Sequence, residues 1–314
     1  MKFIYFLIYL TLTTQIVRIS VAQYLSPVAK KLHTLCLNNS PHEIKNVEIL
    51  NALVCGESLN NYNLNVLFIA VGLIHIFVVS GSHLNKIYKL TYIPIQFLEK
   101  FTHPKLSFLF AQLQIVFLLV YCLMCNLNPP VTRSMAILIL LTTLKKINLH
   151  LSLTSTTLVA GLMCLLIEPL WSTSLSFQMS WLIQLIVMQS CNSISRNKSI
   201  IENFTVYLCL IPTFNILGFP SIISILIAFA LSGVVEFILF PLSFLTYFNH
   251  KMAPLFDLIC DKFVAVLALF ETYTTKASAH QEQIMQLNWF IICMLHAFLA
   301  IQTTQKHREQ DSLI

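Results

Sequence analysis

A short run of histidine, serine and glycine interrupts an apolar stretch and carries the most suggestive side chains of the chain. It reads Gly72-Leu73-Ile74-His75-Ile76-Phe77-Val78-Val79-Ser80-Gly81-Ser82-His83. Polar residues within an apolar segment are costly to insert into lipid, so they usually face protein or water. If one helix continues through Gly81, His75 and His83 fall on the same face. These side chains could line a pore, or they could hydrogen-bond within a bundle and fix its packing.

Ser80 and His83 also combine the residue types of a nucleophile and its general base. A catalytic pair would need an orienting acid and an oxyanion site, and Glu57 is the nearby acid in the sequence. Spacing alone does not bring Glu57 to the pair. We therefore expect no enzyme activity, no catalytic residue and no cofactor. Gly81 instead permits a close backbone approach beside His83.

A double proline opens a second polar stretch, Pro130-Val131-Thr132-Arg133-Ser134-Met135. Proline suits the first turn of a helix, so this stretch predicts the start of one. Arg133 would then lie at the edge of the apolar phase. Its guanidinium could grip a phosphate there, or it could anchor to a lipid headgroup.

Serine and glutamine recur on a third stretch, after the run Glu168-Pro169-Leu170-Trp171 has closed another apolar segment. Ser176, Ser180 and Gln184 are four residues apart, so on a helix they would form a polar stripe. Together with Gln178, they could join neighbouring helices by hydrogen bonds or form part of a channel wall.

A single carboxylate, Glu236, lies inside the apolar stretch that runs to Pro241 and beyond. An ionisable group within a membrane segment is by default a functional candidate. Glu236 could couple transport to protons, pair with an arginine, or lie near the membrane interface.

Nine cysteines are present, and their surroundings separate them into two kinds. Cys36 and Cys55 lie in the polar stretch near the N-terminus and could form a disulfide if that stretch faces an oxidising compartment. Cys122 and Cys125 have redox or zinc spacing, but their neighbours are apolar and no second Cys/His pair lies nearby. We expect them to act as small apolar residues and expect no metal site.

The composition indicates the elements that must position these side chains. Hydrophobic residues make up 57% of the chain and charged residues 10%, and the mean hydropathy is +0.76. A soluble domain of this length could not bury so much apolar surface. We predict an all-α polytopic membrane protein with about 7–9 transmembrane or re-entrant helices, each crossing ~30 Å of hydrocarbon with ~20 residues. The candidate spans are 64–80, 106–126, 131–145, 151–168, 173–191, 204–218, 221–247 and 287–303.

Several of these spans are short or broken. The interruptions are Gly81, Pro129-Pro130, Pro169, Pro212, Pro220 and Pro241. Irregular backbone survives in lipid only where protein buries it or where it lines a wet cavity. Broken helices therefore favour a pore or a transport path over a simple anchor.

The pattern divides the chain into five segments. Residues 1–22 are a signal peptide or a first transmembrane helix, and 23–63 form a small exported segment. Residues 64–247 form the main helical domain, 248–286 an amphipathic interfacial segment, and 287–314 the last transmembrane helix with a short cytoplasmic tail. The net charge of +6 comes from Lys and Arg clustered between apolar runs. Such clusters suit membrane topology and lipid anchoring, or DNA contact.

Five stretches resemble, in order, the ComEC family of competence proteins over about residues 50–245. They are Leu53–Ser58 beside the family's G-[DE]-x-S segment, Ile74–His83 beside H-L-L-A-x-S-G-L-H, Val131–Met135 beside V-x-R-A, Leu166–Leu170 with Ser176–Trp181 beside N-P-x-x-L…GF-Q-L-S-F, and Ile211-Pro212 with Phe240-Pro241-Leu242 where the family has later prolines. Four positions depart from the family's pattern: Ser82 replaces leucine, Asn85 and Lys86 replace small residues, and Ser134 replaces alanine.

The resemblance implies an inner-membrane, multi-pass channel that passes single-stranded DNA into the cytoplasm during natural transformation. It implies membrane lipid, a cytoplasmic helicase-like motor and an extracytoplasmic DNA receptor as partners, with an oligomer possible. The channel or DNA-path candidates would be His75, Ser80, Gly81, His83, Arg133, Gln178, Ser180 and Glu236. The sequence contains no H-x-H-x-D-H cluster, so we expect a reduced form that lacks the family's C-terminal metallo-β-lactamase-like domain.

Two other functions fit the same composition. Broken helices and Glu236 would also suit a small-molecule or ion transporter. A non-catalytic structural subunit of a larger membrane complex would explain the lack of obvious substrate-binding groups. A transformation assay after gene deletion separates both from DNA uptake.

Overall fold

The regular structure of the chain is helical throughout the part that the computed structural model describes. The structure describes residues 18, 20–41, 43–70, 73, 81–99, 104–146, 149, 151–191, 230–271 and 286–299. In chain order the elements are η1 (Val21–Leu25), α2 (Ser26–Asn38), α3 (Val47–Val54), α4 (Tyr62–Ala70), α6 (Gly81–Glu99), α7 (Pro104–Met124), α8 (Pro129–Lys146), α9 (Leu153–Ile167), η2 (Pro169–Thr173), α10 (Leu175–Cys191), η3 (Val235–Leu239), α13 (Phe240–Phe248), η4 (His250–Met252) and α14 (Ala253–Glu271). A last described helix covers Gln286–Leu299. The all-α prediction is confirmed for these residues.

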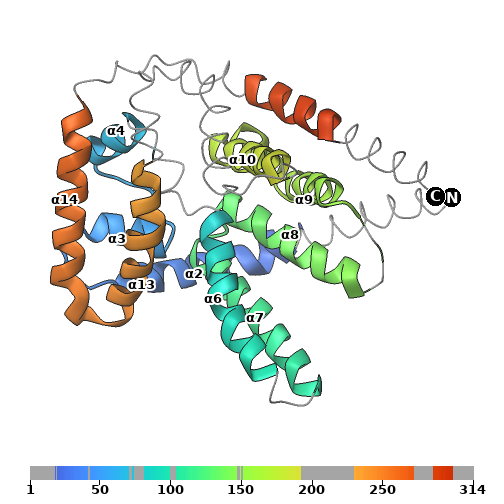
Figure 1. Ribbon diagram of the computed structural model, residues 1–314, viewed down its shortest axis with the longest axis horizontal. Coiled ribbons are helices and arrows are strands. Elements are labelled where there is room, and N and C mark those ends of the chain that lie inside the picture. The colour runs from blue at the N-terminus through green and yellow to red at the C-terminus, as the bar shows by residue number, and fades with distance from the viewer. Residues whose placement is uncertain are drawn as a thin grey trace.

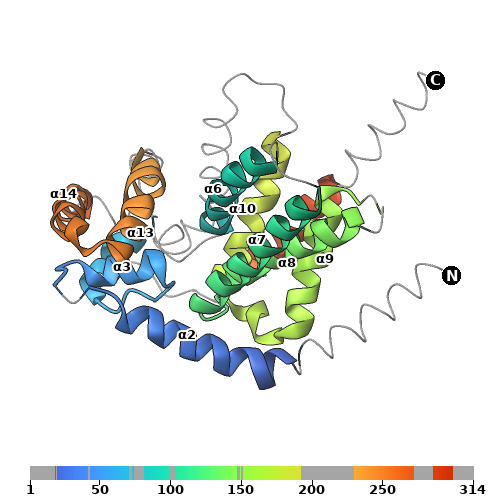
Figure 2. The ribbon, with the colours of Figure 1, turned by 90° about the horizontal axis from the view of Figure 1, so that it is seen from below.

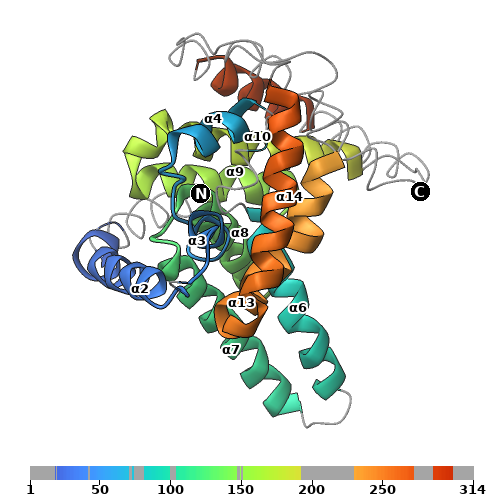
Figure 3. The ribbon, with the colours of Figure 1, turned by 90° about the vertical axis from the view of Figure 1, so that its left-hand side faces the viewer.

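The helices form two neighbouring groups (Figure 1). Helices α3, α4, α13 and α14 gather at one end, and α6 to α10 form the other. Helix α2 runs along one edge of the molecule (Figure 2), and α14 crosses the face formed by α3, α4 and α13 (Figure 3). One apolar core joins both groups, since it contains Leu50 of α3, Trp181 of α10 and Phe256 of α14. The N-terminal segment therefore supplies part of the main core.

Most predicted spans correspond to described helices. The pairs are 106–126 with α7, 131–145 with α8, 151–168 with α9, 173–191 with α10, 221–247 with the helix Ala230–Phe248, and 287–303 with Gln286–Leu299. Span 64–80 overlaps only α4, and 204–218 lies outside the described residues, as do Pro212 and Pro220.

By length and composition, one described helix could cross a membrane: Ala230–Phe248, with 19 residues and a mean hydropathy of 1.7. Five described apolar stretches are shorter, namely Gln112–Met124, Pro129–Leu144, Leu153–Ile167, Leu175–Met188 and Gln286–Leu299.

Local sequence explains where these helices start. Asn126 and Leu127 adopt left-handed φ values of 51° and 52°, which makes a tight turn between α7 and α8. The prolines then begin α8, where a missing N–H leaves no hydrogen bond unmade. The Ser152 side chain caps α9 by accepting a hydrogen bond from the N–H of Ser155 at 3.1 Å.

A disulfide within the segment 23–63 joins its helices, and a hydrogen bond beside the disulfide connects the segment to the rest of the molecule. A disulfide joins Cys36 on α2 to Cys55 at the end of α3, with the Cα atoms 5.9 Å apart. The hydroxyl of Tyr247, near the end of α13, donates a hydrogen bond to the Cys36 carbonyl at 3.1 Å. Gly56 follows with a φ of 73°, a left-handed conformation that glycine adopts without strain.

Two carboxylates of α14, one turn apart, accept hydrogen bonds from the same segment. Asp257 accepts hydrogen bonds from the backbone N–H groups of Lys45 and Asn46 at 3.0 and 2.9 Å. The Lys45 amine donates to Asp261 at 2.9 Å, and so does the Asn46 side-chain amide at 3.0 Å. Hydrogen bonds from Asn46 and Lys45 hold the pKa of the Asp261 carboxyl below its ordinary value of 3.8. Of the predicted interfacial segment 248–286, residues 272–285 lie outside the description.

Candidate functional site

Arg133 lies on the second turn of α8 and points into the bundle toward α10. Its side chain is buried, with 2% of the residue exposed. One terminal nitrogen, Nη1, donates to Oε1 of Gln184, and Nη2 donates to the carbonyl and hydroxyl oxygens of Ser180 at 2.6 and 2.8 Å. Gln184 in turn donates to Thr157 of α9 at 3.3 Å. The guanidinium thus ties three helices together.

Every acceptor of Arg133 in the described chain is neutral. The described ion pairs join other residues, and Nε of Arg133 makes no hydrogen bond to a described residue. A buried charge without a counter-ion is costly, so such groups are rare unless function maintains them. The sequence position of Arg133 suggested the membrane edge and a possible headgroup contact. The headgroup contact is wrong, because protein encloses the guanidinium; the depth of Arg133 in the membrane stays a prediction.

Gly81 begins α6 and lies directly against α8. A Cβ atom added at Gly81 would overlap the Ser134 hydroxyl and come within 3.1 Å of the Ser134 Cβ. The Ser134 hydroxyl is itself held by the Pro130 carbonyl at 3.0 Å. A side chain at position 81 would therefore separate α6 from the turn of α8 that carries Arg133.

His83 lies two residues further along α6 and is fully buried. Its ring stacks on Phe240 with 4.1 Å between centroids and 5° between planes. This contact joins α6 to the start of α13 and supports the packing interpretation of His83.

Lys86 completes the contact between α6 and the helix Ala230–Phe248. Its amine lies 2.8 Å from Oε2 of Glu236 and donates to the Glu236 carbonyl at 3.1 Å. It also lies 4.9 Å from the centre of the Phe237 ring, within range of a cation–π interaction. Glu236 therefore pairs with a lysine and not with an arginine.

The backbone around Glu236 explains why an amine is needed there. Residues 235–239 form a π-helical turn, in which each carbonyl accepts from the N–H five residues later. The N–H of Phe240 goes to the Val235 carbonyl, and the next residue, Pro241, has no N–H to donate. In the π-helical register the Glu236 carbonyl would face Pro241, which has no N–H, and the Lys86 amine donates to this carbonyl. The helix consequently continues through Pro241 to Phe248.

Five of the sequence candidates are linked by these contacts. Gly81 touches α8 beside Arg133, Ser180 binds Arg133, and His83 and Lys86 connect α6 to the turn of Glu236. We define this set (Gly81, His83, Lys86, Arg133, Ser180, Gln184 and Glu236) as the bundle site. His75 and Ser80 lie outside the described residues, so their positions relative to the bundle site stay predictions.

Gln178 belongs to a different network near the N-terminal end of α10. It donates to the Ser172 carbonyl at 2.7 Å and accepts from the Asn288 side chain at 3.2 Å. Trp181 donates to His296 at 3.0 Å, on the same last described helix. This network fits the helix-joining interpretation of the polar stripe.

Sequence reasoning missed Lys86, because it counted as a departure from the family pattern. It also left Glu57 without a partner. The structure pairs Glu57 with Nε2 of His33 at 2.8 Å, while Nδ1 of His33 lies 2.8 Å from the Met124 carbonyl. An acid seven residues before the predicted span 64–80 gives no signal for a histidine on α2.

The described free cysteines match their interpretation as apolar residues. Cys122, Cys125, Cys164 and Cys260 are buried, and Cys293 is exposed on the last described helix. Among the described residues, no three His, Cys, Asp or Glu side chains form a group that could hold a metal ion.

A family model described as Competence protein matches residues 57–308. The matched range begins at Glu57 and contains the whole bundle site. No curated protein and no solved structure matches the chain.

Proposed function

The chain belongs to the competence protein family, and from that premise we propose that it provides a multi-pass membrane path through which single-stranded DNA enters the cytoplasm. The ComEC-type resemblance in the sequence is thereby confirmed, and with it a role in competence and a membrane location. The path, its strand specificity and its topology are the proposal.

The observation that carries the proposal is the buried charge of Arg133. DNA bears one negative charge per phosphate and cannot cross hydrocarbon without a cation-favourable route. Arg133 has no described carboxylate to neutralise it, and its acceptors on α10 are neutral oxygens that an anion could replace. A planar guanidinium is also suited to bidentate phosphate contact. In the structure, Ser180 and Gln184 hold this group in position.

A consistent sidedness supports the multi-pass interpretation. The disulfide-bonded segment contacts the end of α7 through Met124 and the end of α13 through Tyr247. If that segment is exported, both helix ends lie outside. Helix α8 then runs inward and ends at Lys146, and its basic end falls on the inner side, as basic residues do in membrane proteins. Reporter fusions after Asn60 and after the C-terminal residue should report opposite sides.

The proposal is tested by following labelled DNA into cells that carry Arg133 variants. We expect Arg133→Ala to leave DNA protected from added nuclease but absent from the cytoplasm, because capture depends on outer components. Arg133→Lys should keep part of the DNA entry into the cytoplasm if a plain charge suffices, and little of it if bidentate contact is needed. Lys30→Ala, a change of an exposed base on α2, serves as the matched control.

Abundance in the membrane must be equal for all variants, which an immunoblot checks. Ser180→Ala provides a milder change, since it removes one of three described hydrogen bonds and keeps the charge. Normal transformation by Arg133→Ala at normal abundance would reduce Arg133 to a packing role and refute this part of the proposal.

Partners and chemistry follow from the same proposal. The strand would be separated outside by other components and drawn inward by a cytoplasmic helicase-like motor. The chain itself would contribute no nuclease step. Purified protein incubated with single- or double-stranded DNA and Mg²⁺, Mn²⁺ or Zn²⁺ should leave the DNA intact.

A transporter remains the second candidate, favoured by the Lys86–Glu236 pair. Both side chains are about one quarter exposed (27% and 28%), so the ion pair is accessible from outside the packed helices. If Glu236→Gln abolishes a proton-coupled solute flux and leaves DNA uptake unchanged, the transporter is the better description.

A further inference from the structure

We propose that the groove between α14 and the start of the helix Ala230–Phe248 binds the acyl chain of an anionic phospholipid, with its phosphate on Lys262. The groove has a volume of about 400 Å³. It is lined by Leu231, Val234, Leu258, Ile259, Lys262, Phe263 and Val266. The inference rests on the proposed membrane location and is independent of DNA passage.

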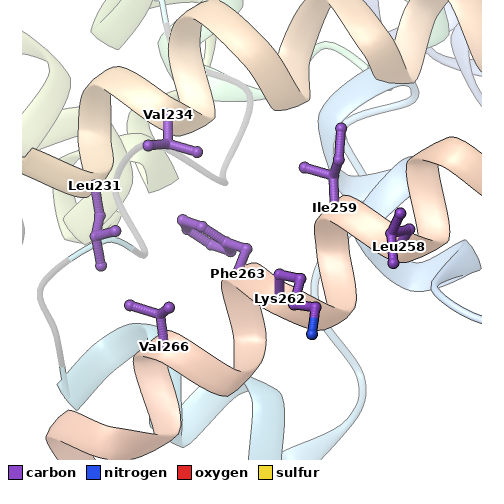
Figure 4. A pocket seen from close by; sticks show the side chains of 7 residues that line it. All are labelled: Leu231, Val234, Leu258, Ile259, Lys262, Phe263 and Val266. Carbon is purple, nitrogen blue, oxygen red and sulfur yellow. The ribbon is translucent and has the colours of Figure 1, made fainter.

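The walls of the groove are apolar and come from two helices. Leu231 and Val234 face it from one helix, and the Phe263 ring points toward them from α14 (Figure 4). Phe263 is buried, while Leu258 and Val266 are 56% and 39% exposed. Apolar side chains that form an open groove are suited to a hydrocarbon chain.

Lys262 is the single charged residue of the groove. On α14 it lies between Leu258 and Val266 at intervals of four, so all three share one face of the helix. An amine above an apolar surface can extend along it and keep its charge in the wet headgroup region. A neutral lipid would leave this charge without a partner, whereas a phosphate would match it.

The acids beside Lys262 make their hydrogen bonds to other residues, and Lys262 acts on Asp261 only as a nearby charge that helps to lower the pKa of its carboxyl. Asp261, its neighbour in sequence, accepts hydrogen bonds from the Lys45 amine and the Asn46 amide at 2.9 and 3.0 Å. Asp257 accepts from the same segment. The described ion pairs do not include Lys262. The positive charge at the groove is therefore available to an anion.

Titration of the detergent-purified full chain with phosphatidylglycerol and phosphatidylcholine, followed by native mass spectrometry, tests the proposal. Wild type should retain one phosphatidylglycerol more tightly than phosphatidylcholine. Lys262→Gln should lower the affinity for phosphatidylglycerol about five-fold, the change expected for one lysine near an anionic headgroup. The affinity for phosphatidylcholine should not change. Lys262→Arg should restore the preference. Lys251→Gln, at an exposed lysine of η4, should leave the affinity for both lipids unchanged.

Val234→Trp tests the acyl-chain half of the site. A larger side chain would fill the groove and lower the affinity for both lipids. Equal affinity of wild type for the two lipids, or equal effects of Lys262→Gln and Lys251→Gln, would overturn the proposal. So would a Lys262→Gln variant that loses affinity for a single-stranded oligonucleotide and keeps phosphatidylglycerol. The DNA-uptake phenotype of Arg133 variants is unaffected by any of these results.

Discussion

Replacing Lys86 by methionine should destabilise the protein chiefly through one carbonyl group. The amine lies beside the Glu236 carboxylate and donates to the Glu236 carbonyl, whose partner in the π-helical register would be Pro241, a residue with no N–H. The ion pair is about one quarter exposed, so solvent screening limits it to about 0.3–1 kcal/mol. A carbonyl deprived of its donor costs about 1–3 kcal/mol. We expect Lys86→Met to lower the free energy of unfolding by about 2–3 kcal/mol.

The two contributions can be separated by restoring the missing N–H. Pro241→Ala gives position 241 a backbone donor in the π-helical register, so the carbonyl no longer depends on Lys86. In that background Lys86→Met should cost about 1–2 kcal/mol less than in the wild type. Glu236→Gln is the control, because it weakens the ion pair and keeps the carbonyl, so its cost should not depend on position 241.

Unfolding free energies in mixed detergent micelles, followed by tryptophan fluorescence, provide the measurement. If Lys86→Met costs the same with proline or alanine at position 241, the donor argument is wrong and the ion pair alone accounts for the effect. The same conclusion would follow if Pro241→Ala changed the cost of Glu236→Gln as much as it changed the cost of Lys86→Met.

Three further outcomes are expected. Gly81→Ala should destabilise the contact with α8 by about 1–3 kcal/mol, and Ser134→Ala in the same chain should partly restore stability by removing the overlapping hydroxyl, as thermal unfolding of the two variants would show. Cys36→Ser should abolish the mobility shift on reducing gels, and Cys55→Ser should behave identically; a shift that persists would refute the pairing. The pKa of Asp261 is lowered on folding, so its link to the segment 23–63 stabilises the protein above the ordinary carboxyl pKa and is lost as the pH falls below it. Protease cleavage of that segment should therefore rise between about pH 5 and about pH 3.

Helix positions were largely predictable where apolar runs are long. The runs that became α7, α8, α9 and α10 needed only hydropathy and the prolines at their ends. Helix α6 was not predicted, because Asn85, Lys86 and Lys89 interrupt its apolar pattern. Its polar groups are satisfied by tertiary contacts, as when the Gln114 amide of α7 donates to the Tyr88 carbonyl at 2.8 Å.

The residues of the bundle site could be nominated from the sequence, but their pairing could not. Arg133 and Ser180 were each conspicuous as polar groups in apolar runs, yet 47 residues separate them. Nothing in local spacing states which helices are neighbours. Likewise a π-helical turn before Pro241 depends on an amine that α6 supplies 150 residues earlier in the chain.

The hydrogen bonds between α14 and the N-terminal segment have a consequence for folding during synthesis. Asn46 is made 211 residues before Asp257, the carboxylate that holds its backbone. At about 5–20 residues per second, the ribosome needs roughly 10–40 s to produce that partner. During this interval α3 lacks α13, the helix that packs against it, so Leu50 and Leu53 would not yet be buried. The Cys36–Cys55 bond closes within 19 residues of sequence and can form long before the rest arrives. Early oxidation would thus limit the conformations of the segment while it awaits its partners, and would make the cell's disulfide-forming machinery a determinant of how much protein matures.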